Sequence, residues 1–97
     1  MIEVKPIGAA GSLEFEVIIR DAGGETRHQV TMARETYERL AGGRSRPEQC
    51  VEAAFEFLLE REPKESILAR FELPVIERYF PDYPHAVRAL LERPDEP

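Results

Sequence analysis

The strongest constraint on the fold is an alternating apolar pattern interrupted by two adjacent glycines, LEFEVIIRDAGGETRHQVTM, at residues 13–32. Alternation with a period of two is typical of strands with one buried face, and a glycine pair between two such runs is typical of a hairpin turn. A turn centred on Gly23 and Gly24 would place Val17 opposite Val30, so that the apolar residues of both strands share one face. The sequence therefore predicts an antiparallel hairpin with an apolar face that must be covered.

A further strand is predicted at the start of the sequence, MIEVKPIG. Ile2 and Val4 alternate with Glu3 and Lys5, and Pro6 follows them. Proline lacks the N–H group that a sheet ladder needs, so it is found mainly in edge strands. We therefore expect this segment to be a short strand at one edge of the sheet.

The rest of the chain carries apolar residues at helical spacing, divided by proline and glycine. The longest run opens with Pro47, and its apolar residues recur as in an amphipathic helix that crosses the apolar face of the hairpin. In FELPVIERYFPDYP, residues 71–84, the three prolines fall where short helices would start and stop, so we expect a helical lid over the core. The pattern predicts four to five helices, at residues 34–41, 47–62, 65–71, 74–80 and 83–92.

The predicted fold is α+β, with a small two- or three-stranded antiparallel sheet that contains the hairpin and is packed by helices mostly against one face. Residues 1–92 are expected to form a single domain, because no linker divides them, and residues 93–97 to form a disordered tail. The expected core residues are Phe15, Val17, Val30, Val51, Phe55, Leu58, Ile67, Leu68, Phe71 and Ile76.

The formal net charge of −6 is concentrated in the second half of the chain. Residues 48–97 hold twelve acidic and six basic side chains, whereas residues 1–47 hold seven of each. This acidic half disfavours contact with nucleic acid or an anionic membrane on its side. No apolar run approaches the roughly 20 residues that cross a bilayer, and the start of the chain lacks the pattern of a signal peptide. Together with a single cysteine, these features predict a cytoplasmic protein, and the excess of arginine over lysine is typical of a GC-rich bacterial genome.

The residues able to carry catalysis are few. Cys50 falls in the first turns of the predicted long helix, and the only histidines are His28 and His85. A cysteine nucleophile needs a base beside it, and nothing in the pattern brings either histidine to Cys50. A zinc site needs more Cys and His ligands, at defined spacings. The sequence therefore predicts no catalytic residue, no metal, no cofactor and no enzymatic activity.

Nucleic-acid binding is the alternative function that the sequence leaves open. Residues 65–80 have the length and apolar spacing of a degenerate helix-turn-helix, but its second helix would expose little more than Glu77 and Arg78. A recognition helix needs polar and basic side chains that reach bases and phosphates. A second possibility is a cluster of basic residues in the first half of the chain: Arg27, Arg34, Arg39, Arg44 and Arg46.

Two surfaces are candidates for binding a protein partner. On the outer face of the hairpin, Ile18 stands among polar residues, so the sheet could associate with a second copy. The other surface is a stripe on the long helix, where glutamates recur every four residues: Glu48, Glu52, Glu56 and Glu60. Like charges at this spacing are mildly unfavourable, so the stripe is either a docking surface for a basic protein or a solvated face neutralised by Arg61, Lys64 and the preceding arginines. The sequence thus predicts a small non-catalytic protein–protein interaction module.

Several segments of the chain carry a family resemblance. The hairpin, VTMARETYERLAGG and EAAFEFLLEREPKESILARFELPVIERYFPDYP together resemble a group of small uncharacterised bacterial proteins, over roughly residues 12–85. The most specific marks are FLLEREP and IERYFP. This resemblance implies a free-standing cytoplasmic protein and carries no activity, cofactor or site residue.

Overall fold

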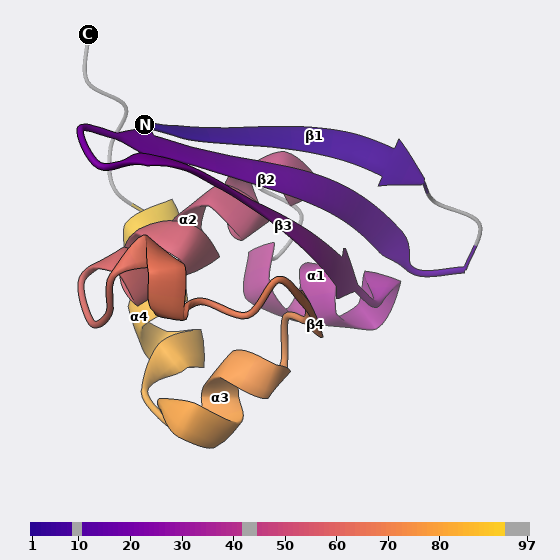
Figure 1. Cartoon of the computed structure of the whole chain (residues 1–97). Helices are drawn as coiled ribbons and strands as arrows, with labels where there is room; N and C mark the ends of the chain where they lie inside the picture. The colour runs from indigo at the N-terminus through magenta and orange to yellow at the C-terminus, as the bar shows by residue number, and fades with distance from the viewer. Residues whose placement is uncertain (9–10, 42–44, 93–97) are drawn as a thin grey trace, which may run out of the picture.

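In the computed structural model, residues 1–8, 11–41 and 45–92 are described. Within these ranges the chain forms a sheet with α-helices on one face, so the predicted α+β class is confirmed (Figure 1). The sheet has four strands rather than the two or three predicted, and it is mixed rather than antiparallel because β4 pairs in parallel with β3. The strands, in their order across the sheet, are β1 (Ile2–Gly8), β2 (Leu13–Asp21), β3 (Gly24–Met32) and β4 (Arg70–Glu72). The helices are α1 (Arg34–Ala41), α2 (Pro47–Leu59), α3 (Val75–Tyr79) and α4 (Tyr83–Leu91), and a 3-10 turn occupies Lys64–Ser66. The predicted tail, residues 93–97, lies outside the described residues.

The hairpin of β2 and β3 is present, but its register differs from the expected one by two residues. Val17 pairs with His28, and Val30 pairs with Phe15. A shift of two residues leaves every side chain on its original face of the sheet. Phe15, Val17 and Val30 are therefore all buried, as predicted, although their partners are different.

The shift arises because Ala22 and Gly23, rather than the two glycines, form the turn between the paired residues Asp21 and Gly24. The Asp21 carboxylate accepts a hydrogen bond of 2.8 Å from the Gly23 N–H, which favours a turn at this point. Gly24 has a φ of +124°, a conformation that only glycine adopts readily. Lys64, from the 3-10 turn, bonds the same carboxylate at 2.8 Å and holds the pKa of Asp21 below its usual value. The hairpin turn is thus tied to the segment that follows α2.

The predicted helix at residues 65–71 is wrong. After the 3-10 turn the chain extends into β4, which runs parallel to β3. The Ala69 carbonyl accepts a hydrogen bond of 2.8 Å from Gln29, and the Leu73 N–H donates one of 2.9 Å to Thr31, so β4 satisfies backbone groups at the edge of β3. Leu68, expected in the core, is 51% exposed.

Because that first helix is absent, residues 65–80 do not form a helix-turn-helix. The other predicted helices are present, with ends within three residues of the expected ones. The prolines of the 71–84 segment lie where they were expected: Pro74 directly precedes α3, Pro81 separates α3 from α4, and Pro84 lies in the first turn of α4.

The core lies between the sheet and α2, which packs against β1, α1 and α4 (Figure 1). Phe55 is fully buried at its centre, with its ring centroid 5.5 Å from that of His28 and 5.9 Å from that of Phe71. The prediction that α2 crosses the apolar face of the hairpin is therefore confirmed. No helix within the described ranges is both long and apolar enough to cross a membrane.

Candidate functional site

The acidic stripe follows the only solvent-facing side of α2. Of its glutamates, Glu52 and Glu60 are exposed, and Glu48 and Glu56 are half-buried. Most of the other positions of the helix are buried: Cys50, Val51, Ala53, Ala54, Phe55, Phe57 and Leu58. A helix buried on so wide an arc must place its polar residues on the narrow remaining strip, which recurs every three to four residues. The regular spacing of the glutamates therefore follows from packing alone, without a partner.

Two of the basic side chains expected to neutralise the stripe, Arg61 and Lys64, are also bonded to acidic residues outside it. Arg61 pairs with Glu60 at 3.5 Å, but the same guanidinium also bonds Asp82 at 3.0 Å. Lys64 does not reach the stripe, because its amine bonds Asp21 and Glu65 instead. The stripe can contribute long-range attraction for basic partners.

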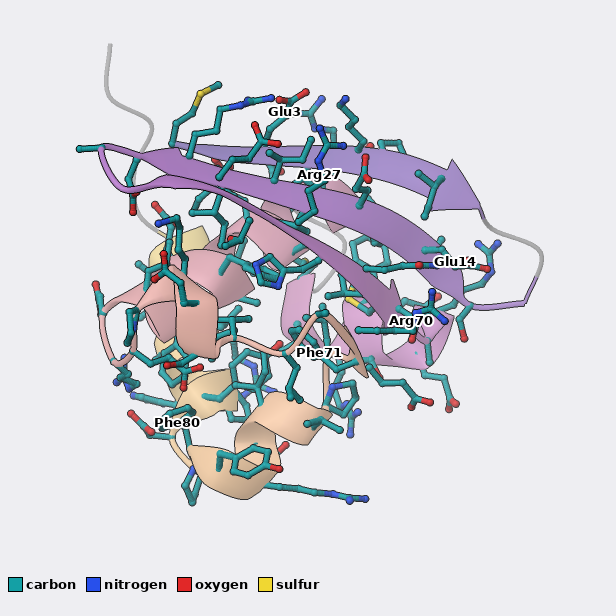
Figure 2. All side chains as sticks on the ribbon, in the orientation of Figure 1. Glu3, Glu14, Arg27, Arg70, Phe71 and Phe80 are labelled. Carbon is teal, nitrogen blue, oxygen red and sulfur yellow. The ribbon has the colours of Figure 1, made fainter. Side chains whose placement is uncertain are left out.

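Ile18 lies on the outer face of the sheet, but its side chain is only 1% exposed. Its cross-strand neighbours on that face are Glu3 and Arg27 (Figure 2). A chain of ion pairs surrounds it, with N–O distances of 2.8–3.6 Å: Glu3–Arg20, Arg20–Glu25, Glu25–Arg27 and Arg27–Glu16. Ile18 is therefore covered by its own charged neighbours and offers no apolar contact to a partner at this face.

The five arginines proposed for nucleic acid do not form one surface. Arg27 lies on the outer face of the sheet and is paired with Glu16 and Glu25. Arg34 and Arg39 belong to α1, on the opposite side of the sheet, and Arg46 directly precedes α2. The fifth, Arg44, lies outside the described residues. The cluster is thus divided between the two sides of the sheet. Nucleic-acid binding stays a prediction, ranked below protein binding.

Cys50 and the two histidines lie in three different environments. Cys50 is fully buried in α2, and burial raises the pKa of its thiol to about 11. His28 is buried in β3, where Nδ1 donates to the Leu68 carbonyl at 2.8 Å and Nε2 bonds the Thr26 hydroxyl at 2.9 Å. His85 is exposed on α4. Within the described ranges, no three His, Cys, Asp or Glu residues are grouped to hold a metal ion.

We expect the Cys50 thiol to be inert in the folded protein. A raised pKa leaves little thiolate at neutral pH, and burial blocks access to a reagent. A chromogenic disulfide reagent at pH 8 should react slowly with native protein and rapidly with protein unfolded in urea. Rapid labelling of the native protein at pH 7 would contradict both the burial of Cys50 and the prediction that Cys50 is not catalytic.

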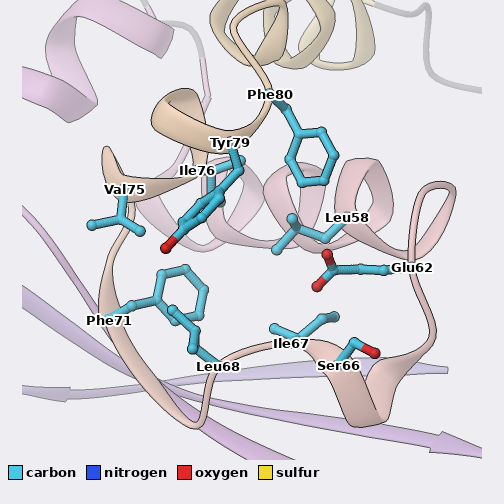
Figure 3. Close-up of a pocket in the computed structure, with 10 residues that line it drawn as sticks. All are labelled: Leu58, Glu62, Ser66, Ile67, Leu68, Phe71, Val75, Ile76, Tyr79 and Phe80. Carbon is cyan, nitrogen blue, oxygen red and sulfur yellow. The ribbon is translucent and has the colours of Figure 1, made fainter.

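An apolar groove lies between the segment after α2 and α3, with a volume of about 270 Å³ (Figure 3). We define it by six apolar side chains and one carboxylate: Leu58, Ile67, Leu68, Phe71, Tyr79, Phe80 and Glu62. Leu68 is 51% exposed and Tyr79 is 69% exposed, so large apolar side chains at the groove are open to solvent. In the described part of the chain, no cation lies within ion-pair distance of the Glu62 carboxylate.

The groove lies between segments that the sequence predicted to form a helical lid over the core. The polypeptide from Ser66 to Phe71 forms one wall, and α3 with Phe80 forms the other (Figure 3). The prediction missed the groove because it placed Leu68 inside a helix that does not exist. The density of aromatic residues in the 71–84 segment was the available signal, and it was assigned wholly to the core.

Comparisons with known proteins assign no function to this chain. No protein-family model, no curated protein and no solved structure matches it significantly. The resemblance based on FLLEREP and IERYFP therefore stays a prediction, and the function is inferred from the surfaces of the molecule itself.

Proposed function

We propose that this chain is a small, non-catalytic, cytoplasmic interaction module that binds a segment of a partner protein in the apolar groove. The observation that carries the proposal is the exposure of Leu68 and Tyr79 beside a preformed hollow. Large apolar side chains at a hollow are typical of binding surfaces, and tyrosine is enriched among the residues that dominate binding energy.

The size of the groove favours a protein segment over a metabolite. Pockets for small molecules usually measure roughly 300–1,000 Å³ and enclose most of the ligand. The groove lies at the lower limit of this range, at about 270 Å³, and its Leu68 and Tyr79 side chains are exposed rather than enclosing, so it suits one or two apolar side chains that project from a larger partner.

The charge of the groove favours a basic partner. Glu62 lines it, and the acidic stripe of α2 lies on the helix from which the groove residue Leu58 also comes. A partner segment with an apolar anchor next to lysine or arginine would satisfy both the hollow and the carboxylate. The stripe would then raise the rate of encounter without being the contact itself.

Selection of peptides tests this proposal directly. Random peptides displayed on phage are selected on the wild-type protein and depleted on Leu68→Asp. We expect enriched peptides to combine an apolar residue with a neighbouring Lys or Arg, and synthetic copies to bind the wild type at least tenfold more tightly than Leu68→Asp. Glu62→Lys should weaken the same peptides, because it replaces the attracting charge with a repelling one.

The matched control is Ile7→Asp, since Ile7 is also 51% exposed but lies on β1 and does not line the groove. It should bind the peptides as the wild type does. Peptides that bind Leu68→Asp as tightly as the wild type, or a selection that enriches none, would refute binding in the groove.

A further inference from the structure

β1 lies at one edge of the sheet and pairs with β2 on one side. Met1 and Arg20 exchange both backbone hydrogen bonds, at 2.9 and 2.8 Å. In an antiparallel ladder such pairs alternate with pairs that are not hydrogen-bonded, so the backbone groups of Ile2, Val4 and Pro6 point away from β2. This outer edge has no backbone partner in the described part of the chain.

Pro6 falls at one of the outward positions. Its missing N–H therefore leaves the β1–β2 ladder intact and removes one donor from the free edge. The N–H groups of Ile2 and Val4 and the three outward carbonyls remain. An edge of this kind can still pair with another strand, but only in a register that does not require a donor at Pro6.

On the outer face of the sheet lie Glu3 and Lys5 of β1, with Met1 directly before the strand and Ile7 at an irregularity of the β1–β2 ladder between Pro6 and Gly8. Met1 is 76% exposed and Ile7 is 51% exposed, and they account for two of the four large apolar side chains exposed among the described residues. Ile7 borders a hollow together with Arg27, which confirms that it lies on the outer face. Figure 2 shows Glu3 and Arg27 on this same face.

We propose that β1 pairs antiparallel with β1 of a second copy, centred on Val4, and joins the two sheets into one. In this register the two Val4 residues exchange both hydrogen bonds, and each Ile2 N–H donates to the Pro6 carbonyl of the other copy. Glu3 then faces Lys5 of the second copy, and Met1 faces Ile7. Each side chain on the outer face thus meets one of complementary chemistry.

Neighbouring symmetric registers do not have this property. A pair centred on Glu3 places the two glutamates opposite each other, and a pair centred on Lys5 does the same with the two lysines. Like charges directly opposite each other destabilise a sheet. A pair centred on Pro6 brings together two residues that cannot donate. The charges and the proline therefore select the register centred on Val4.

This contact uses a surface separate from the groove, so it goes beyond the proposed function and is tested independently. A single edge contact buries less than the roughly 800 Å² per partner of a typical stable interface. We therefore expect a weak dimer that forms reversibly as the protein concentration rises. Sedimentation velocity over a concentration series measures it.

Charge reversal tests the register. In Lys5→Glu, the glutamates at positions 3 and 5 face each other across the contact; in Glu3→Lys, the lysines do. Each variant alone should lose at least tenfold in dimer affinity, whereas an equimolar mixture should form a heterodimer, because every contact again pairs opposite charges. Circular dichroism confirms that both variants are folded, and Glu52→Lys, a reversal on α2, should dimerise as the wild type does.

Hydrogen exchange gives a second readout. The Ile2 and Val4 amides should become protected as wild-type concentration rises, and they should exchange rapidly in Lys5→Glu at every concentration. A wild-type protein that stays monomeric at ~1 mM, where even weak interfaces are populated, would overturn the proposal. So would a dimer that Lys5→Glu leaves unchanged, or a mixture of the two variants that stays monomeric.

Discussion

Replacing Phe55 with Ala should lower the free energy of unfolding by about 3–5 kcal/mol, the largest effect expected of any single substitution proposed for this chain. Phe55 is fully buried between α2 and the sheet, and its ring contacts those of His28 and Phe71. The substitution removes an aromatic side chain and leaves a cavity that the surrounding residues can only partly fill. Small domains have a total free energy of unfolding of about 5–15 kcal/mol, so the substitution removes a large part of it.

Urea unfolding followed by circular dichroism measures this change. Phe55→Leu keeps most of the apolar volume, so it should remain folded and lose less free energy of unfolding. It can therefore be measured even if Phe55→Ala does not fold. The matched control is Tyr79→Ala, because Tyr79 is an aromatic residue that is 69% exposed. It should change stability by no more than about 0.5 kcal/mol. Equal losses for Phe55→Ala and Tyr79→Ala would show that the core is wrongly assigned.

Phe55 could be placed from the sequence because a long amphipathic helix and an alternating hairpin each reveal their buried face without knowledge of the rest of the chain. Both patterns repeat several times, so a single exception does not obscure the period. The faces of β2, β3 and α2 were predicted for this reason, as was the edge position of β1, which Pro6 indicates.

The register of the hairpin was harder to predict from the sequence, because two glycines offered two places for the turn. The choice depends on the Asp21 side chain, which bonds the Gly23 N–H, and on the φ of Gly24. The two-residue shift has one consequence on the outer face: it places Arg20 opposite Glu25, so that opposite charges meet across the strands.

β4 could not be predicted, since three residues are too few to show a period. Its hydrogen bonds go to Gln29 and Thr31, which lie far away in the sequence. Ile67, Leu68 and Phe71 happen to fit helical spacing, and only the fold shows that the edge of β3 needs a partner there. The groove depends on the same element, because the extended chain before β4 turns Leu68 outward.

The second large effect distinguishes the strand from the helix that the spacing predicted. Leu73→Ala should lower the free energy of unfolding by about 2–5 kcal/mol, because Leu73 is fully buried directly after β4. The hydrogen bond from its N–H to the Thr31 carbonyl, 2.9 Å, is made by the backbone and survives the substitution. The loss therefore reports on packing of the side chain.

Leu68→Ala is the matched comparison, since it removes the same atoms five residues earlier. In a helix over residues 65–71, Leu68 would be a core residue and Leu73 would lie in the following turn, so Leu68→Ala would be the damaging change. In the structure Leu68 is 51% exposed, and we expect Leu68→Ala to change stability by no more than about 0.5 kcal/mol. Urea unfolding of the two variants side by side decides between the strand and the helix. A greater loss for Leu68→Ala than for Leu73→Ala would contradict β4, and with it the wall of the groove that exposes Leu68 to a partner.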